Sequence, residues 1–364
     1  VAAHLCFQER LNRMQDSPQY KRILVRAPNW LGDVIMLTPC IRALRDAFPD
    51  AHVGVLVKKN FADVFRQNPA VNEIIPFDSD RGLRKIFALR RLVKKGGFDL
   101  AIVFPRSFRS ALPVSLARVP RRIGYGTEGR GFLLTDAVPR EKELLKTHRV
   151  NYYAHLLRPL GVEKVPDRTE IFPSEDDFSW ADRFLANAGS AKETPLIALH
   201  CGAAYGTAKQ WPHERFARLA GLLHKEYNAR IIIVGGPGEK KPAEKIAADA
   251  GCDCKISAGK TTVLQLAALL KRCDLLVTND TGPMHVADAA GTRILAVFGP
   301  TDPVTTAPYG RFHRIVTVNA GCAPCLLREC PTDHRCMTGV TVEMVLKETG
   351  RMLATKTERE TKPE

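Results

Sequence analysis

Residues 275–285, LLVTNDTGPMH, decide the fold of this chain. The apolar run 275–278 leads into a short polar loop with a glycine, and Pro283 then begins a helical pattern. A buried strand that passes directly into a helix is the unit of an open α/β sheet, in which ligands bind at the carboxyl ends of the strands. The same arrangement occurs at NWLGD, residues 29–33. We therefore expect one site built from two loops, one in each half of the chain.

Composition limits the class of protein. The chain has 364 residues, of which 45% are hydrophobic, and this is enough for two domains. No apolar run approaches the roughly 20 residues that a membrane-spanning helix needs. The first 20 residues lack the apolar core of a signal peptide, so we expect a cytoplasmic protein. The net charge of +15 favours an anionic partner, although it also suits simple solubility.

Short apolar runs alternate with helical patterns in two series. The runs are 22–26, 53–57, 74–77 and 100–104 in the first half, and 196–200, 231–234, 275–278 and 294–298 in the second half. Between the first two runs, one helix is predicted over 33–48, because Pro49 ends the pattern. Strands that alternate with helices predict parallel sheets with helices on both faces. The predicted fold class is therefore α/β, with two doubly wound domains.

Changes in composition place the domain boundaries. We expect an N-terminal extension (1–20), a first domain (21–173), a polar linker with a short helix around 180–187 (174–194), a second domain (195–340) and a C-terminal helix (341–355). The charged segment 356–364 is expected to be disordered.

The second loop suits a phosphate group. A helix that begins at Thr281 or Gly282 presents its first N–H groups and the positive end of its dipole to a ligand above the sheet. His285, one turn later, would face the same ligand. The alternative is that Asp280 and Thr281 only cap the helix. Because Asp280 is negative, a functional Asp280 would accept hydroxyl hydrogen bonds or orient a neighbour.

Three other positions carry candidate chemistry. Lys209 ends a glycine-rich loop after the apolar run 196–200, where an ammonium group can neutralise a diphosphate, although most loop lysines are simply solvated. The turn 235–239 is similar to a nucleotide-binding turn but lacks a complete motif. Asp33 begins a helix, which suits a general base, but capping is the commoner role of such an aspartate.

Four segments in combination resemble the ADP-heptose:lipopolysaccharide heptosyltransferases, glycosyltransferase family 9. They are 29–33 (NWLGD), 209–212 (KQWP), 280–285 (DTGPMH) and 298–303 (FGPTDP). The resemblance extends from about Lys21 to Leu353. The cysteine-rich segment 322–336 and residues 208–212 are most similar to the heptosyltransferase II group of this family.

The resemblance implies a GT-B architecture, in which two Rossmann-like domains face each other across a cleft. The second domain would bind the nucleotide-sugar donor, and the first would bind the acceptor. The implied reaction is inverting transfer of L-glycero-D-manno-heptose from ADP-heptose to the inner core of lipopolysaccharide, with no metal or other cofactor. By position, Asp33 would be the catalytic base, and Lys209 would balance the charge of the leaving diphosphate.

The resemblance also implies the donor contacts. Glu239 would contact the ribose and Asp280 the donor sugar, while Thr281 and Gly282 would present backbone N–H groups to the phosphates. Thr207, the hydroxyl residue nearest to Lys209, and His285 complete the expected nucleotide-sugar site.

The first domain carries a basic set that could bind the acceptor. Its members are Arg106, Arg109, Arg118, Arg121, Arg122, His148 and Arg149, and we favour Arg106, Arg109 and His148. Arginine binds phosphates and carboxylates through paired hydrogen bonds, while the alternative is a solvated surface. The same residues could hold the enzyme against the anionic inner face of the inner membrane, as a peripheral protein.

Four cysteines near the end form the pattern C-x2-C-x4-C-x5-C: Cys322, Cys325, Cys330 and Cys336, with His334 among them. Such a cluster can bind zinc, but its spacing is irregular for a known zinc fold. A disulfide is a second alternative, and packed free thiols are the interpretation that we favour.

Other functions remain open at the level of sequence. A glycosyltransferase that uses another nucleotide-sugar, or a nucleotide-sugar epimerase, could share the fold. A basic protein that binds RNA or membranes would explain the net charge but would leave Asp33, Lys209 and Asp280 without a role. We therefore expect no nucleic-acid partner.

Overall fold

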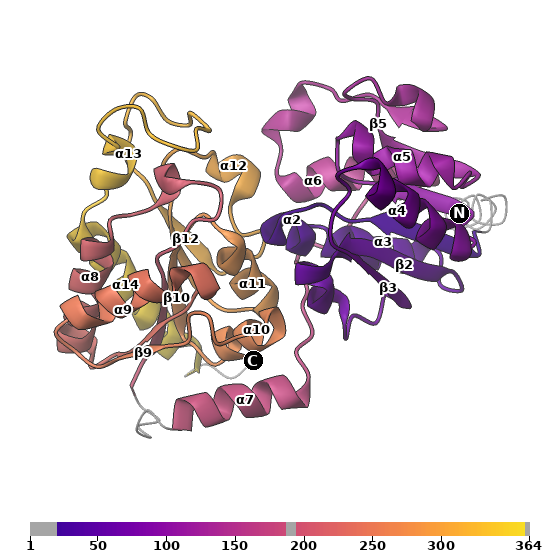
Figure 1. Ribbon diagram of the computed structural model, residues 1–364. Coiled ribbons are helices and arrows are strands. Elements are labelled where there is room, and N and C mark those ends of the chain that lie inside the picture. The colour runs from indigo at the N-terminus through magenta and orange to yellow at the C-terminus, as the bar shows by residue number, and fades with distance from the viewer. Residues whose placement is uncertain (1–19, 187–193, 361–364) are drawn as a thin grey trace, which may run out of the picture.

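Two six-stranded parallel sheets form two domains that lie side by side (Figure 1). The computed structural model describes residues 20–186 and 194–360, without the side chains of 355–360. The strand order is β3-β2-β1-β4-β5-β6 in the N-terminal sheet and β12-β11-β10-β7-β8-β9 in the C-terminal sheet. Both are orders of a Rossmann-type sheet. The predicted fold class, two doubly wound α/β domains, is therefore confirmed.

The strands form where the sequence has its apolar runs. The N-terminal sheet contains β1 (Arg22–Arg26), β2 (His52–Lys58), β3 (Glu73–Phe77), β4 (Leu100–Val103), β5 (Arg121–Tyr125) and β6 (Asp136–Val138). The C-terminal sheet contains β7 (Leu196–His200), β8 (Arg230–Ile233), β9 (Cys254–Ile256), β10 (Leu275–Asn279), β11 (Ile294–Val297) and β12 (His313–Val316). The prediction lacks β5, β6, β9 and β12. Three of these are short edge strands, and β5 begins with two arginines, so none of them forms an apolar run.

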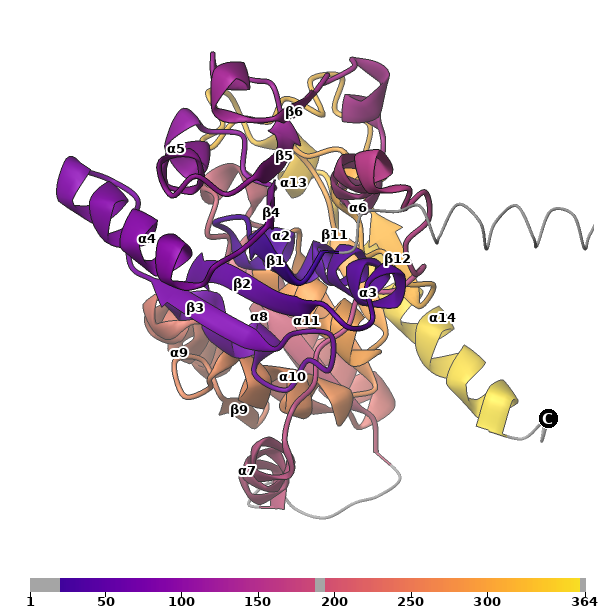
Figure 2. The ribbon, with the colours of Figure 1, turned by 90° about the vertical axis from the view of Figure 1, so that its right-hand side faces the viewer.

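Helices cover both faces of the N-terminal sheet. On one face, α4 (Leu83–Lys95) and α5 (Phe108–Leu116) pack against each other (Figure 2). The other face is covered by α2 (Leu31–Met36), α3 (Thr38–Ala47), η1 (Lys59–Phe65), α6 (Arg149–Ala154) and η4 (His155–Leu160). Two further 3-10 turns, η2 (Gly131–Leu133) and η3 (Glu143–Lys146), lie in loops after β5 and β6.

The C-terminal sheet is covered in the same way. One face packs against α8 (His213–Tyr227), α9 (Lys240–Asp249) and α14 (Val342–Glu360). The face toward the N-terminal domain packs against α10 (Val263–Lys271) and α11 (Gly282–Ala290), and α7 (Glu175–Ala186) lies on α10. The shorter elements are η5 (Thr207–Lys209), η6 (Pro237–Glu239), α12 (Pro303–Thr306) and α13 (Arg335–Thr338).

The two domains meet through α11 and α2 (Figure 1). One apolar cluster runs without a break from Val34 and Ile35 of α2 to Met284 and Val286 of α11. Burial of this kind stabilises an interface by about 25 cal/mol for each Å² of apolar surface removed from water. The start of α2, which carries Asp33, is therefore fixed against the start of α11 in the other domain.

The single helix predicted over 33–48 is wrong, because the chain forms two helices that meet at Leu37. Pro39 is the physical cause: it has no N–H group to donate to the carbonyl oxygen of Ile35. The hydroxyl group of Thr38 donates to that oxygen instead, at 2.8 Å. Asp33 therefore lies on a short helix, α2, that is separate from α3.

The predicted linker and tail contain more helix than expected. Ser174 and Asp177 exchange hydrogen bonds that start α7 at Glu175, so much of 174–194 is helical. Residues 187–193 lie outside the described part of the chain. At the C-terminus, α14 continues to Glu360, past the expected end at 355. Residues 1–19 and 361–364, in the expected extension and tail, are also outside the description. Among the described residues, no helix combines the length and apolar character needed to cross a membrane.

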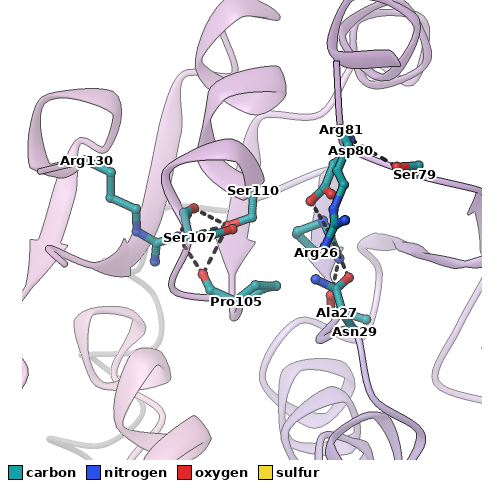
Figure 3. A network of polar contacts seen from close by, with 10 residues as sticks. All are labelled: Arg26, Ala27, Asn29, Ser79, Asp80, Arg81, Pro105, Ser107, Ser110 and Arg130. Atoms are coloured by element: carbon teal, nitrogen blue, oxygen red, sulfur yellow. Dashed lines mark hydrogen bonds and ion pairs between the residues drawn. The ribbon is translucent and has the colours of Figure 1, made fainter. Parts of the chain in front are cut away.

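Two fully buried arginines, Arg26 and Arg130, are features that the sequence analysis does not anticipate. Arg130 donates to the carbonyl oxygens of Tyr125 (2.8 Å), Ser107 (3.2 Å) and Pro105, and to the hydroxyl group of Ser110 (3.0 Å; Figure 3). Burial lowers the pKa of Arg130 to about 10, so the side chain stays positive at neutral pH. One cation therefore fastens the loop after β4 to the loop after β5.

We expect Arg130→Met to lower the free energy of unfolding by about 3 kcal/mol, because several buried carbonyl groups lose their donor. Urea unfolding followed by circular dichroism measures the change. Arg109→Met is the matched control, because Arg109 is exposed in α5, directly after the loop that Arg130 holds, and its effect should stay within about 0.5 kcal/mol. Equal losses in the two variants would contradict the structural role of Arg130.

Candidate active site

The second loop brings Lys209 and Asp280 together. The Nζ atom of Lys209 lies 2.6 Å from Oδ2 of Asp280, and both side chains are largely buried, with 13% and 4% exposed. Thr306 also donates to this oxygen, at 3.4 Å. Asp280 therefore orients Lys209, as the sequence analysis expects for a functional Asp280. The ammonium group also lies over the ring of Tyr205, 5.2 Å from its centroid.

Asn279 joins the Lys209 loop to the end of β10. Its side-chain amide donates to the carbonyl oxygens of Cys201 (2.9 Å) and Gly202 (3.1 Å), and its carbonyl accepts from the N–H of Trp211 (3.1 Å). All of these contacts are buried. They fix both ends of the loop that carries Lys209, a role that the sequence analysis does not assign to Asn279.

A buried histidine at the end of β7 connects the other donor-side residues. His200 Nε2 lies 3.2 Å from Glu239 Oε2, and His200 Nδ1 lies 3.1 Å from the hydroxyl group of Thr281. A carboxylate only accepts, so Nε2 donates to Glu239. Burial alone would raise the pKa of Glu239, but the hydrogen bonds from His200 and from Gly236 N–H outweigh it and lower this pKa.

The start of α11 has no side-chain cap. Thr281 occupies the N-cap position, but its hydroxyl group is directed to His200 and forms no hydrogen bond to the helix. Pro283, in the first turn, has no N–H group. The N–H groups of Gly282 and Met284 therefore keep the capacity to bind an anion. The simple capping alternative does not describe this loop.

On the N-terminal side, Asp33 is held by α6. Its Oδ1 atom accepts a hydrogen bond from Tyr153 at 2.7 Å, and Arg149 Nε lies 3.9 Å from the same oxygen. Burial, and then the charge of Asp33, raise the pKa of Tyr153 well above its usual value, so Tyr153 remains a donor. Both contacts approach Oδ1, and the Asp33 side chain is 26% exposed. Oδ2 is thus the oxygen that can accept a proton from an incoming hydroxyl group.

His285 lies at the contact between the two halves. Its ring packs against Gly32, and only 3% of the residue is exposed. Burial lowers its pKa, although the charges of Asp280, Asp288 and Asp33 act in the opposite direction. Within the described residues, Nδ1 has no hydrogen-bond partner. The sequence predicts that His285 faces the nucleotide-sugar. The structure places it deeper, against the loop that carries Asp33.

The remaining expected donor residues lie around this core. Thr207 is exposed at the first position of η5, two residues before Lys209. Glu239 ends η6 and approaches Gly202 so closely that the glycine has no room for a side chain. The loops after β7, β8 and β10 thus bring the predicted donor set to one edge of the C-terminal sheet.

The basic residues of the first domain do not form one group, because some lie at the carboxyl ends of the strands and others at the amino ends. Arg106 and Arg109 are exposed after β4, at the edge nearest Asp33. Arg121 and Arg122 begin β5 at the opposite edge, where Arg121 pairs with Asp136 at 2.9 Å. These two positions, and the neighbouring Arg118, are therefore remote from the candidate site.

His148, the third favoured acceptor residue, lies in the domain contact. Its Nε2 atom is 2.9 Å from the carbonyl oxygen of Ala307, its Nδ1 atom accepts from Val150 N–H, and its ring stacks on Tyr309. Burial lowers its pKa. An acceptor group could bind His148 only in place of one of these hydrogen bonds.

The four clustered cysteines are free thiols that line a small cavity of about 90 Å³. In the described part of the chain, no group of three or more His, Cys, Asp or Glu side chains is placed to hold a metal ion. The segment does support the donor side. The carbonyl oxygen of Arg328 accepts a hydrogen bond from Ala208 N–H at 3.0 Å, and His334 Nε2 lies 2.6 Å from the carbonyl oxygen of Ala208. Both backbone groups of the residue before Lys209 are therefore held by this segment.

Together, the fold and the site define a class of enzyme. Two Rossmann-like domains pack against each other, and the helix that carries Asp33 in one contacts the uncapped helix that follows Asp280 in the other. This is the architecture of a GT-B glycosyltransferase. The model of glycosyltransferase family 9 (heptosyltransferase) matches residues 86–335, and the chain belongs to this family.

Relatives with known names and structures agree. Lipopolysaccharide heptosyltransferase 2 of Salmonella typhimurium is 30% identical, over 92% of this chain and 99% of that protein. The enzyme of the same name from Escherichia coli is 29% identical, over 91% and 98% of the two chains. The solved structure of the E. coli ADP-heptose LPS heptosyltransferase II superimposes with a TM-score of 0.78 at 28% identity, covering 92% and 99%. The resemblance to the heptosyltransferase II group is therefore confirmed.

We expect Lys209→Met to weaken the binding of inorganic pyrophosphate by about 10- to 100-fold, the usual effect of losing a charged hydrogen-bond donor. Isothermal titration calorimetry measures the affinity. Lys260→Met, at an exposed lysine of the same domain, should have no effect.

A second variant separates the anion site from the buried pair. In Lys209→Met/Asp280→Asn, the partner carboxylate is also neutral, so no unpaired charge remains. Affinity in this double variant should stay low. Recovery of the affinity would show that Lys209 only neutralises Asp280.

Proposed function

We propose that this enzyme transfers L-glycero-D-manno-heptose from ADP-heptose to a hydroxyl group of the lipopolysaccharide inner core, with inversion at the anomeric carbon. The names of the relatives support lipopolysaccharide as the acceptor, and the name of the solved structure supports ADP-heptose as the donor. The observation that carries the mechanism is the division of the site: Asp33 belongs to one domain, whereas Lys209 and the start of α11 belong to the other.

Inversion requires a nucleophile and a leaving group on opposite faces of the donor sugar. In the proposed step, Asp33 accepts the proton of the acceptor hydroxyl group. At the same time, the oxygen of that hydroxyl group forms a bond to the anomeric carbon. The bond from that carbon to the phosphate oxygen breaks, and its electron pair leaves with ADP. Lys209 and the N–H groups at the start of α11 stabilise the additional charge on ADP. These groups supply the stabilisation without a cofactor.

Tyr153 has a positioning role in this proposal. Its hydroxyl group holds Oδ1 of Asp33 at 2.7 Å, so that Oδ2 is directed to the acceptor. A residue fixed in this way loses little entropy when the reacting groups come together. Because the pKa of Tyr153 is well above its usual value, the tyrosine keeps its proton through the working pH range.

The donor contacts follow from the same geometry. Glu239 uses Oε2 for His200 and Gly236, which leaves Oε1 to accept from the ribose hydroxyl groups. When a diphosphate draws the ammonium group of Lys209 toward itself, the carboxylate of Asp280 can accept hydroxyl groups of the sugar. Thr207 would add a hydroxyl donor to the phosphates, and His285 would position the Asp33 loop, because its ring packs against Gly32.

Arg106 and Arg109 are the proposed acceptor residues, because they are exposed at the edge of the sheet that carries Asp33. Inner-core acceptors present phosphates and carboxylates, which arginine binds through paired hydrogen bonds. Since such an acceptor is a membrane lipid, we place the enzyme at the cytoplasmic face of the inner membrane, as a peripheral protein.

We expect Asp33→Asn to abolish transfer, with a loss of at least about 10³-fold, while ADP affinity stays within about twofold of the unaltered enzyme. The amide keeps the size of the carboxylate but cannot accept the proton. Transfer from ADP-heptose to a truncated lipopolysaccharide core is followed by mass spectrometry, and ADP binding by calorimetry. Retained transfer would contradict the role of Asp33 as the base.

The donor sugar is tested with ADP-glucose in the same assay. Equal kcat/KM values for the two donors would contradict heptose specificity, while leaving the roles of Asp33 and Lys209 intact.

We expect Gly202→Ala to weaken ADP binding by about tenfold, because a Cβ atom at this position would lie 1.4 Å from Oε1 of Glu239 and displace the carboxylate. Gly238→Ala is the matched control, since nothing lies within 4 Å of its Cβ position. Calorimetric titration with ADP measures both. Identical affinities in the two variants would remove Glu239 from the nucleotide site.

A further inference from the structure

Helix α4 has an unusual surface for a helix at the outside of a domain. Its sequence, LRKIFALRRLVKK, contains six basic residues and no acidic residue. Ile86, Leu89 and Val93 pack into the domain, yet Leu83 and Phe87 on the outer side are 74% and 49% exposed. These two lie one turn apart, next to basic residues. Single exposed apolar side chains are common, but a basic helix that exposes several is typical of binding at a membrane interface.

A second group of apolar side chains lies near the start of the neighbouring helix, α5. Phe132, in η2, is 75% exposed, and its ring lies 5.9 Å from that of Phe108 at the start of α5. η2 contacts α5, which packs against α4, and the chain enters η2 and α4 from the same ends of the strands. Both follow the carboxyl ends of strands, β3 and β5, which is the edge that carries Asp33.

Buried arginines anchor both exposed groups (Figure 3). Arg26 pairs with Asp80, at 3.3 Å, in the loop that leads into α4, and it donates to Asn29 of the Asp33 loop at 3.1 Å. Arg130 holds the turn that displays Phe132 in the same manner. The exposed side chains therefore project from fixed backbone, and the α4 end is connected to the catalytic loop.

We propose that this surface binds an anionic lipid bilayer. We call it the docking face and define it as Leu83, Phe87, Arg91, Lys94 and Phe132. The apolar side chains would enter the interface between lipid headgroups and acyl chains, and the basic groups would pair with anionic headgroups. This inference rests on the proposed function, because a lipid-linked acceptor would then meet the edge that carries Asp33, Arg106 and Arg109.

The chemistry of the docking face selects lipid over the other polyanions. A nucleic acid could pair with the basic groups of α4, but Leu83 at 74% exposed would gain nothing from phosphates or base edges. An acidic protein surface would satisfy the charges but would require a shaped cavity for the phenylalanines. A fluid bilayer accepts basic and protruding apolar groups together.

The test compares binding of the full chain to two kinds of vesicle by co-sedimentation: phosphatidylcholine alone, and phosphatidylcholine with a third of phosphatidylglycerol. We expect binding to the anionic vesicles only. Arg91→Glu/Lys94→Glu should weaken it by at least about 30-fold, as expected for roughly 1 kcal/mol per lost basic residue. Leu83→Ser/Phe87→Ser/Phe132→Ser should weaken it by at least about tenfold.

Two controls use the other domain. Lys241→Glu/Lys245→Glu on α9 and Phe312→Ser at β12 alter exposed residues of the same kinds, and both should bind vesicles normally. A separate assay, transfer to a soluble acceptor without acyl chains, should give unchanged rates in both docking-face variants. Circular dichroism reports whether the variants fold, and this assay tests the proposed function independently of the membrane.

The docking face is overturned if its variants bind anionic vesicles as well as the controls do. It is also overturned if the unaltered chain binds RNA but no vesicles, or if the variants lose transfer to the soluble acceptor. The last result would assign α4 to the acceptor site itself.

Discussion

Close packing of two helix starts sets the distance between the halves of the active site. At Gly32, an added Cβ atom would lie 2.6 Å from the ring of His285, and at Gly282 it would lie 3.1 Å from Leu31. The two glycines allow α2 and α11 to approach, and the apolar cluster around them holds the approach in place. Because Asp33 follows Gly32 and Asp280 lies two residues before Gly282, the same contact positions the proposed base relative to the proposed diphosphate site.

Each side of this contact has its own support. On the donor side, Asn279, His200 and the cysteine-rich segment fix the loops that carry Lys209 and Glu239. On the acceptor side, Tyr153 holds Asp33, and Arg26 connects its loop to the start of α4. These contacts hold the residues that we propose to react, and groups held in this way lose less entropy on reaching the transition state.

The sequence predicts the sheets well and the site in part. Central strands such as β1 and β10 are apolar over their whole length, whereas short edge strands carry too few apolar residues to be detected. Asp33, Lys209 and Asp280 lie in loops that follow apolar strands, and this position marks them as candidates. His200 could be found in a similar way, because it is the polar residue that ends β7. Tyr153 has no such signal, because its partner lies 120 residues away. Arg26 and Arg130 are not detected for another reason: a buried arginine bound by backbone and side-chain oxygens has the same local sequence pattern as a solvated one.

The central claim is that the α2–α11 contact aligns two separately formed halves, and Gly32→Ala tests it most directly. The added methyl group would push against His285 and separate the helices, while the nucleotide loops of the C-terminal domain stay intact. We predict that ADP affinity, measured by calorimetry, changes by less than about twofold and that transfer falls by about 100-fold, as expected for a misplacement of about 1 Å. Unchanged transfer, or an equal loss of ADP binding and transfer, would contradict the account.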